Sequence, residues 1–397
     1  MDKIFRVFAS HGPYSHAELD LPASDYEMLD LMDRLRLEPG QCPDAEIIKG
    51  PEYDHEYDYL EDHIQDQPDP YQLNVLAKKL SELTSARDMA AFEGLVGMEM
   101  QKGDEPIAIP KLIDFAYSTD CCHAVGDVVT DVQLGKFLVE NDFVEETNDL
   151  PESALALLDY EKIGREHRER EGGVYTGFGY VEQHSAMRHV SDTMDFQPQK
   201  PAYTVLLRMA ARPPAGRIRP EDVIRLELPA PEAQIQEALE KLGQKDWNNV
   251  VAAIQDCSIP GMKQETYLDG EIQQVMELAQ CLSELDGQSK LTKYKALLAA
   301  EDCNNLSRMI SLADAVDEYI LEPQISSPED LAREELGVIV CSQDAEILLP
   351  YVDLAGYGHA LLEREQAVIT QYGLLDRDRS QAMDMGQSSA PEGMVMM

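Results

Sequence analysis

Apolar and polar positions along the chain follow two spacings, an alternation of period two and a helical stripe of period 3.6. Residues 4–22 alternate on both sides of a polar turn at 11–13, which predicts a pair of β-strands. A helix should follow, because apolar residues recur at helical spacing from Met28 to Leu35 and Ser24 forms a capping-box pattern with Glu27. The chain is therefore predicted to open with a β-β-α segment.

The second half of the chain repeats motifs of the first half, at offsets that fall steadily along the sequence. The repeats run from Leu19–Ala23 to Leu226–Ala230 at an offset of 207, from Ala77–Leu83 to Ala279–Leu285 at 202, and from Leu157–Gly164 to Tyr351–Gly358 at 194. A falling offset is expected if the second copy lost a few loop residues at a time. The sequence therefore predicts two copies of one unit, and what persists in both copies is helix geometry and acidity.

Each copy reads as a β/α segment, then helices, then an α/β segment, so the predicted fold class is α+β. In the first copy we expect helices over 73–83, 89–100 and 110–117, a capped helix from Thr130-Asp131, and a closing strand-like run at 173–181. In the second copy the corresponding segments are 275–285, 290–300, 306–319, the helix from Ser327-Pro328, and 367–374.

The domain boundaries follow from the repeat and from changes in composition. We expect a first unit over 1–190 (about 1–65 α+β, 66–125 helical, 126–190 α+β), a linker over 191–201, and a diverged second unit over 202–379. Residues 380–397 are rich in Met, Ser and Gly without periodicity, which predicts a disordered tail.

The charge of the chain is strongly unbalanced. Its 397 residues include 75 acids and 33 bases, a formal net charge of −42. The acids cluster, since residues 44–69 contain ten acids, interleaved with tyrosines, and one lysine, Lys49. Concentrated charge of one sign repels itself and is typical of a protein with a basic partner. Duplex DNA carries one phosphate charge per ~1.7 Å, so 42 carboxylates match roughly 70 Å of duplex.

The basic residues do not form a nucleic-acid patch. Arg165, Arg168 and Arg170 alternate with glutamates, which indicates ion pairs between residues one helical turn apart on an exposed helix. We therefore expect no direct binding to nucleic acid.

The cellular location can be predicted from three sequence features: a signal peptide, long apolar segments and the pattern of cysteines. Met1–Arg6 leads into strand-like sequence rather than a signal peptide, and no segment approaches the roughly 20 apolar residues that span a bilayer. The seven cysteines are scattered and odd in number. These features predict a cytoplasmic protein without a membrane segment.

Motifs that would carry chemistry are weak. Gly177–Gly179 begins a G-x-G pattern, but Glu182 takes the place of the last glycine, so a tight turn between strands is the better interpretation. Cys121–His123 lacks the second ligand pair of a zinc site, so we expect buried cysteines there. His55 and His63 lack the spacing of a metal-binding helix, and no calcium loop occurs. We therefore expect no catalytic residues, no cofactor, no metal and no enzymatic activity.

One set of stretches in the first half matches the pattern of a known family. The set comprises the opening strand and turn into Leu19–Ala23, the acidic Asp54–Asp62, the helix Leu73–Leu83, Leu134–Glu140, Leu150–Glu152, Leu158–Arg165, Gly172–Val174 and Gly179–Val181. These stretches resemble the ArdA antirestriction family over about residues 1–190. The second half keeps Tyr351–Asp353 and Gly358 but loses the acidic tyrosine run.

The resemblance implies an elongated α+β protein made of a tandem of two ArdA-like units, each with small β-rich, helical and α+β subdomains. It implies a DNA mimic, in which carboxylates stand where duplex phosphates would lie. Such proteins occupy the DNA-binding groove of type I restriction-modification enzymes, and they are usually encoded on mobile genetic elements. The expected partners are therefore the methyltransferase and specificity subunits of those enzymes.

The resemblance also indicates which acids bind the partner, because antirestriction in the family is associated with the segment matching Val139–Tyr160. Together with the acidic tyrosine run, the expected partner-binding residues are Glu52, Asp54, Glu56, Asp58, Glu61, Asp62, Glu140, Asp142, Glu145, Glu146, Asp149, Glu152, Asp159 and Glu161.

The length of this chain departs from the family, whose members are typically half as long and dimerise. The chain is expected to form either a pseudo-dimer within one molecule or a homodimer. Two other classes of function remain open at this point. One is an acidic adaptor for another basic DNA-processing protein of a mobile element, such as a relaxase or a transcription factor. The other is an acidic hydrolase, which would lose turnover when a single carboxylate is replaced.

Overall fold

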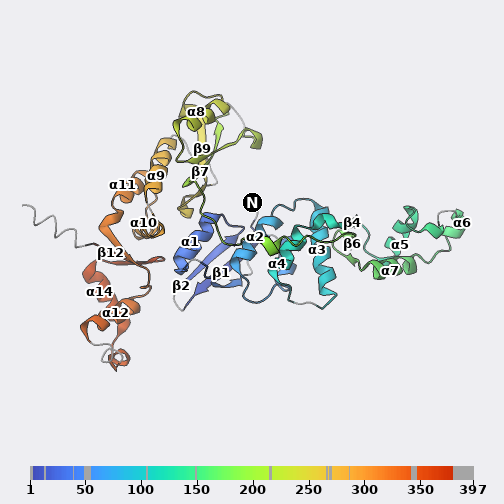
Figure 1. Cartoon of the computed structure of the whole chain (residues 1–397), viewed down its shortest axis with the longest axis horizontal. Coiled ribbons are helices and arrows are strands. Elements are labelled where there is room, and N and C mark those ends of the chain that lie inside the picture. The colour runs from blue at the N-terminus through green and yellow to red at the C-terminus, as the bar shows by residue number, and fades with distance from the viewer. Residues whose placement is uncertain are drawn as a thin grey trace, which may run out of the picture. The chain divides into compact units, whose positions relative to one another are not determined.

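The protein has a mixed α+β fold, as the sequence predicts. The computed structural model describes residues 3–12, 15–38, 40–48, 55–103, 106–147, 150–213, 217–264, 267, 271–285, 287–340 and 347–378, which form helices and small three-stranded antiparallel sheets (Figure 1). The predicted tail at 380–397 lies outside the described residues.

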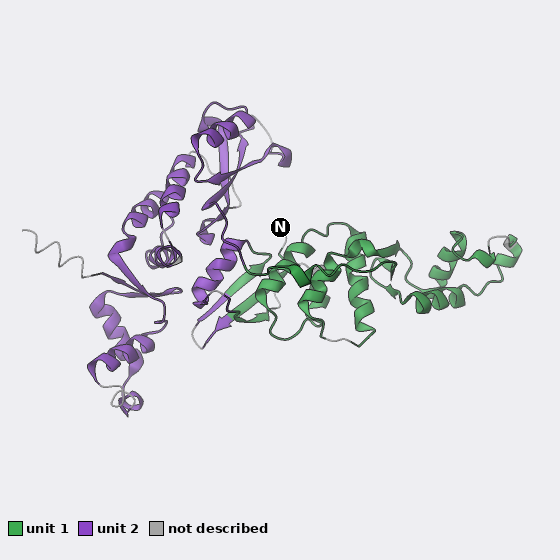
Figure 2. Ribbon diagram, viewed as in Figure 1, with its two compact units in different colours: residues 1–9, 18–23, 42–197 green, residues 10–17, 24–41, 198–397 purple. Residues whose placement is uncertain are grey.

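The chain divides by internal contacts into two compact units, coloured separately in Figure 2. Unit 1 consists of residues 1–9, 18–23 and 42–197, and unit 2 consists of residues 10–17, 24–41 and 198–397. The division at 197/198 falls inside the predicted linker, where residues 191–193 form a short 3-10 helix. The assignment of 24–41 to unit 2 differs from the boundaries expected from the repeat.

The chain opens with strands β1 (Phe5–His11) and β2 (Ser15–Leu21), helix α1 (Asp25–Leu35) and strand β3 (Asp44–Ile47), with sheet order β2-β1-β3. Alternate residues of β1 are buried, in agreement with its period-two pattern. The predicted capping box is confirmed, because the Ser24 side chain accepts from the backbone N–H of Glu27 and the Glu27 side chain accepts from that of Ser24.

The middle of unit 1 is helical, with α2 (Pro70–Leu80), α3 (Ala86–Met100) and α4 (Ile109–Ala116). Asp69 caps α2 by accepting from the backbone N–H groups of Tyr71 and Gln72. The predicted stripe of leucines on α2 is buried, as Leu73, Leu76 and Leu80 are each at most 1% exposed. Burial of this stripe fixes the face that α2 turns to the core.

The end of unit 1 combines a sheet with a helical pair. The strands are β4 (Cys122–Gly126), β5 (Val174–Tyr175) and β6 (Gly179–Gln183) in the order β4-β6-β5, and the helices are α5 (Asp131–Glu140), α6 (Glu152–Leu155) and α7 (Tyr160–Glu171). The predicted run 173–181 is two strands joined by a turn at Gly177, which confirms the turn expected in place of a phosphate loop. The cysteines Cys121 and Cys122 are buried, as expected.

Helices α5 and α7 approach at two glycines. A Cβ atom at Gly135 would lie 1.9 Å from the backbone oxygen of Tyr160, and one at Gly164 would lie 1.9 Å from that of Asp131. Only a residue without Cβ allows this contact between backbones. A small core of Val128, Leu134, Leu138 and Tyr180 lies beside it. We call residues 127–171 the α5–α7 module.

Unit 2 begins with a second three-stranded sheet and its helices. The elements are β7 (Val205–Ala211), β8 (Ile224–Leu228), α8 (Glu232–Lys241), β9 (Val250–Cys257), α9 (Ile272–Glu284), α10 (Gln288–Ala300) and α11 (Leu306–Asp314), with sheet order β8-β7-β9. The predicted helix 306–319 ends at Asp314, because a 3-10 turn and a strand follow.

The end of unit 2 consists of β10 (Tyr319–Glu322), α12 (Pro328–Ile339), α14 (Leu354–Glu365), β11 (Val368–Thr370) and β12 (Gly373–Arg377), with sheet order β10-β12-β11. A Cβ atom at Gly358 would lie 1.9 Å from the backbone oxygen of Pro328, so α12 and α14 meet as α5 and α7 do. We call residues 323–366 the α12–α14 module.

The described elements occur in the same order in both halves. Asp159 and Asp353 each cap the helix that carries the close-approach glycine, five residues on. A threonine hydroxyl, of Thr176 in one half and Thr370 in the other, donates to the carbonyl oxygen of the glycine that opens the next strand. These equivalent positions keep the offset of 194 found in the sequence.

Helix α1 belongs to unit 2 because its side chains are buried against residues of the second half. The Lys295 ammonium lies 2.8 Å from Asp30 Oδ1 and 2.9 Å from Asp33 Oδ2, and the Tyr372 hydroxyl donates to Asp30 Oδ1 at 2.9 Å. The Ser24 hydroxyl donates to Asp256 at 2.7 Å. Burial alone would lower the pKa of Lys295, but the carboxylates of Asp30 and Asp33 raise it above the ordinary value.

Candidate acidic partner-binding surface

The structure describes the side chains of eight of the fourteen predicted partner-binding residues. Glu52, Asp54 and Asp149 lie outside the described residues. Glu56 and Asp58 lie in a 3-10 helix at His55–Leu60 and Glu152 lies in α6, and their side chains are not described. The remaining residues are Glu61, Asp62, Glu140, Asp142, Glu145, Glu146, Asp159 and Glu161.

Four of these carboxylates follow one another at the C-terminus of α5. Glu140 is the last residue of α5, Asp142 lies in the turn, and Glu145 and Glu146 begin a 3-10 helix. All four are exposed, and none forms an ion pair with a described residue. The turn brings them together because Asp142 has a φ of 60° and Phe143 N–H donates to the Leu138 carbonyl. We call these four residues the α5 acidic turn.

The charge of the α5 acidic turn opposes local stability. The C-terminus of a helix carries a partial negative charge, so the carboxylates of Glu140 and Asp142 are unfavourable at the end of α5, whereas Glu145 and Glu146 begin a 3-10 helix. Four carboxylates within seven residues also repel one another. A structural role does not account for this charge, which is therefore the best candidate for a binding role.

Two of the predicted residues have structural roles instead. Asp159 caps α7, since its side chain accepts from the backbone N–H of Lys162 at 3.0 Å. Glu161 forms an ion pair with Arg165 at 3.7 Å, one helical turn away. The prediction of ion pairs one helical turn apart on this helix is confirmed for Arg165 and is wrong for the other two arginines, because Arg168 pairs with Asp131 of α5 and Arg170 with the adjacent Glu171.

The acidic tyrosine run is partly a structural element. Tyr57 and Leu60 of the 3-10 helix are at most 5% exposed, so this segment buries one face in unit 1. Glu61 is half-buried, Asp62 is exposed, and both have interaction partners. The burial of Tyr57 and Leu60 shows that the tyrosine-rich acidic run contributes apolar side chains to the core as well as charge to the surface.

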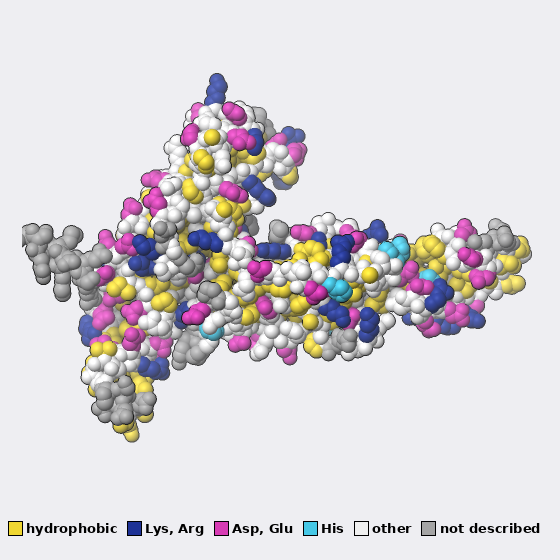
Figure 3. Space-filling view, viewed as in Figure 1, with side chains coloured by type: hydrophobic (Ala, Val, Ile, Leu, Met, Phe, Trp, Pro, Cys, Tyr) yellow, Lys and Arg dark blue, Asp and Glu magenta, His cyan; other side chains and the backbone are white. Residues whose placement is uncertain are grey.

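Two exposed apolar side chains, one within the α5 acidic turn and one just before α7, were missed by sequence reasoning. Phe143 is 66% exposed and Leu157 is 86% exposed. The Phe143 ring stacks on that of Phe137, with centroids 5.9 Å apart. Figure 3 shows acidic and apolar side chains together over α5, α6 and α7. One feature of the sequence could have indicated this exposure. Phe143 is a lone aromatic residue among acids, and no helical or strand periodicity predicts that it is buried.

The α5–α7 module is held together by a polar cluster around Asp131. The Asp131 carboxylate accepts from Arg168 Nε at 2.8 Å and from the Tyr175 hydroxyl at 2.8 Å. The hydrogen bond from Arg168 lowers the pKa of Asp131, and burial raises the pKa of Tyr175. Nearby, the hydrogen bond from His167 lowers the pKa of Glu182. These groups fix the orientation of α7 on its sheet.

Acid should weaken this module through Asp131. The pKa of Asp131 is lowered in the folded chain and is about 3.9 in the unfolded chain. The ionised carboxylate therefore contributes fully to the free energy of unfolding above about pH 4, and this contribution is lost as pH falls further. We expect Asp131→Asn to increase hydrogen exchange of α5 and α7 at pH 6. The difference from the wild type should shrink below pH 4, with both proteins compared at each pH. A difference that grows on acidification would contradict this assignment.

The α12–α14 module carries nearly the same net charge as its counterpart. Residues 127–171 contain 13 acids and five bases, a net charge of −8, and residues 323–366 contain nine acids and two bases, a net charge of −7. Exposed apolar residues recur here as well, with Val338 at 79% and Tyr351 at 85% exposure. Charge and exposed apolar surface therefore occur together in both modules.

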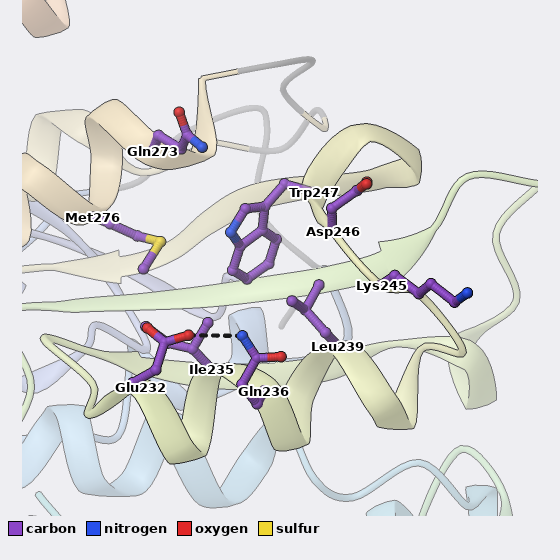
Figure 4. A pocket seen from close by; sticks show the side chains of 9 residues that line it. All are labelled: Glu232, Ile235, Gln236, Leu239, Lys245, Asp246, Trp247, Gln273 and Met276. Atoms are coloured by element: carbon purple, nitrogen blue, oxygen red, sulfur yellow. Dashed lines mark hydrogen bonds between the residues drawn. The ribbon is translucent and has the colours of Figure 1, made fainter.

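The two cavities of unit 2 are lined by none of the described partner-binding residues that the sequence predicts. One cavity of about 350 Å³ lies in unit 2 between α8, α9 and the loop of Trp247 (Figure 4). Its polar residues are satisfied or exposed, and Gln236 donates to Glu232 at 2.7 Å. Among the described residues, no group of three or more histidine, cysteine or acidic side chains could hold a metal ion. No helix in the described ranges is long and apolar enough to cross a membrane.

Comparisons with known proteins found no family model that matches this chain and no curated protein that matches it.

Proposed function

We propose that this chain is an antirestriction DNA mimic, which occupies the DNA-binding groove of a type I restriction-modification enzyme through its carboxylates. The proposal rests on the resemblance of residues 1–190 to ArdA proteins and on the net charge of −42. The observation that carries it is the α5 acidic turn. Its four carboxylates are exposed, lack ion pairs with described residues and repel one another within seven residues.

A mimic of this kind needs a basic partner and no catalytic group. A groove that binds duplex DNA presents Lys and Arg side chains at the spacing of phosphates, and exposed carboxylates can pair with them. We propose the methyltransferase and specificity subunits as partners, acting in the cytoplasm, and two ArdA-like units in tandem. The similar net charges of the α5–α7 and α12–α14 modules, −8 and −7, support a role for both units.

The proposal is tested by competition between this chain and duplex DNA for a purified type I methyltransferase. We expect the chain to displace DNA, and its binding to weaken steeply as salt rises. Replacing Glu140, Glu145 and Glu146 by Gln and Asp142 by Asn should reduce the magnitude of the salt slope by about 3 to 4, roughly one for each lost contact. The measurement is binding affinity over a salt titration.

A matched control changes the same charge elsewhere. Glu221, Glu232, Glu237 and Glu240 are exposed acids in and before α8, and their replacement by Gln also removes four charges. We expect this variant to change the salt slope less than the variant of the α5 acidic turn. Salt-insensitive binding, or no displacement of DNA, would exclude the proposal.

One observation favours a second function, an acidic adaptor for another basic DNA-processing protein of a mobile element. Phe143, within the α5 acidic turn, and Leu157, just before α7, are exposed, and apolar contacts are weakly affected by salt. An adaptor should keep its partner at high salt and lose it when Phe143 and Leu157 are replaced by Ser. Capture of a relaxase or transcription factor, without restriction subunits, would favour this alternative.

The tandem copies are proposed to act as a pseudo-dimer within one chain. Sedimentation at increasing protein concentration should then give the mass of one chain, 44.5 kDa. A concentration-dependent dimer would favour the homodimer instead, and a scattering profile of a compact sphere would count against the extended arrangement.

A further inference from the structure

The cavity between α8, α9 and the loop of Trp247 has an apolar wall that the proposed function does not use. Ile235 and Leu239 of α8 are at most 8% exposed, and Trp247 and Met276 are partly buried against the same core. The volume of about 350 Å³ lies near the lower end of the range typical of sites for small molecules, about 300–1,000 Å³. The cavity therefore fits one small molecule with an apolar body.

Helix α8 presents two hydrogen-bond acceptors to this cavity. Figure 4 shows Glu232 and Gln236 on the side of α8 that faces Trp247. The Gln236 amide nitrogen donates to Glu232 Oε1 at 2.7 Å, and no described residue donates to Glu232 Oε2 or to Gln236 Oε1. Both side chains are exposed, so a molecule in the cavity can reach these two oxygens. Two neighbouring acceptors favour a ligand group with several donors on one atom, such as an ammonium.

The charge of this wall favours a cation. Glu232 forms no ion pair with a base in the part of the chain that the structure describes, and Lys241 of the same helix pairs with Glu237 at 2.8 Å. Lys245 also lines the cavity, but Figure 4 shows its ammonium pointing away from the indole, and the next residue, Asp246, carries the opposite charge. The field of a chain with 42 excess negative charges adds to the attraction for cations.

The indole of Trp247 provides a further attraction for a cation. Tryptophan is the aromatic side chain whose ring attracts a cation most strongly. The rest of the wall is apolar, and the thioether of Met276 makes favourable contacts with aromatic rings. Burial of an alkyl or aryl group against this wall removes apolar surface from water. The cavity therefore combines a cationic preference at Glu232 with an apolar preference beside it.

We propose that this cavity binds a small primary amine with an apolar body, in its protonated form. The ammonium donates to Glu232 Oε2 and Gln236 Oε1 and lies against the indole of Trp247, while the apolar body covers the wall beside them. A carboxylate of the same size meets two acceptors and the charge of Glu232, so it is repelled. An alcohol of the same size keeps the apolar contacts but loses the ion pair.

The test is titration of the full-length chain with an aromatic amine, 2-phenylethylamine, and an aliphatic amine, hexylamine. Binding is followed by calorimetry and by the emission of Trp247, the single tryptophan of the chain, which lines the cavity. We expect at least one amine to bind at a single site with a Kd below about 1 mM. The alcohol and the carboxylate of the same length should each bind at least about tenfold more weakly, because each lacks the ion pair with Glu232.

Two variants of α8 separate the cavity from the general negative charge of the chain. Glu232→Gln should weaken amine binding at least about tenfold, because it removes the carboxylate that faces the ligand. Glu240→Gln removes the same charge from an exposed position of the same helix that does not line the cavity, so it should leave binding unchanged. Urea unfolding followed by Trp247 emission reports whether unit 2 of each variant is folded.

Any of three results would overturn the proposal: no saturable binding of either amine, equal binding of the alcohol or the carboxylate, or equal effects of the two substitutions. The analogue series uses the wild-type chain, so it decides the matter even if a variant misfolds. Failure here would not affect the DNA competition, which is assigned to the α5 acidic turn of unit 1, and failure of that competition would not affect the amine site.

Discussion

Replacing Lys295 by Met should lower the free energy of unfolding of unit 2 by about 3–5 kcal/mol, the cost of leaving buried carboxylates without their cation. Lys295 is 4% exposed, and the side chains of Asp30 and Asp33 are 11% and 8% exposed. Methionine fills a similar volume, so the loss is electrostatic rather than a cavity. The measurement is urea unfolding followed by the fluorescence of Trp247.

A second lysine on the same helix serves as a control, because its replacement shows what the loss of an exposed lysine costs. Lys290 of α10 has a side chain that is 43% exposed and pairs with Asp317 at 3.1 Å. We expect Lys290→Met to cost less than about 1 kcal/mol, as exposed ion pairs do. Adding Asp30→Asn and Asp33→Asn to Lys295→Met should restore part of the lost stability. Equal effects of the two lysine replacements would refute the buried role.

The second large effect is expected at the glycines between paired helices. In Gly164→Ala the new Cβ would lie 1.9 Å from the backbone oxygen of Asp131, so α5 and α7 must move apart. Overpacking of this kind costs about 1–3 kcal/mol, and here the obstacle is backbone, which cannot rotate away. Hydrogen exchange of α5 and α7 amides should accelerate accordingly, while α2 to α4 remain protected.

The α12–α14 module offers a matched pair for the same test. Gly358→Ala in α14 meets the backbone oxygen of Pro328 at 1.9 Å and should destabilise its module as Gly164→Ala does. Gly337 of α12 has no atom within 4 Å of its Cβ position, so Gly337→Ala should stabilise the helix by up to about 1 kcal/mol. Opposite signs at Gly358 and Gly337 are the expected result. A change in stability of the same sign at both glycines would show that helix propensity, and not the close contact between backbones, determines the effect of the substitution.

Local features of the fold could be predicted from the sequence, because they depend on neighbouring residues. The capping box at Ser24, the leucine stripe of α2 and the turn at Gly177 each involve a few consecutive residues. The repeat at an offset of 194 is also visible in the sequence, since Asp159 and Asp353 cap equivalent helices.

Contacts between distant residues could not be predicted from the same patterns. The helical stripe of α1 indicates that one face is buried, but it does not indicate the partner, which is Lys295 on a helix 262 residues after Asp33. A lysine within α10 reads as a surface residue until Asp30 and Asp33 are placed beside it. Boundaries drawn from the repeat therefore assign 24–41 differently from the contacts.

The candidate site was predicted in part. The acids of the α5 acidic turn were expected from the resemblance, whereas their exposed apolar neighbours were not, because periodicity identifies faces of helices and Phe143 lies in a turn. Composition alone also could not separate free acids from paired acids. Glu140 has Lys136 one helical turn away and Glu161 has Arg165, so the two glutamates look alike in the sequence, and among the described residues only Glu161 forms its ion pair.

Helix α1 lies in the first half of the sequence but belongs to unit 2, and this limits where the chain can be cut into fragments. A fragment ending at residue 197 would retain α1 but lose Asp256, Lys295 and Tyr372, leaving Asp30 and Asp33 without the cation that neutralises them. The complementary fragment from residue 198 would keep Lys295 buried with no carboxylate from α1 beside it. Half-length expression clones should therefore yield insoluble or poorly structured products, and circular permutation or grafting of 24–41 onto the C-terminal fragment is the better route to an independent half.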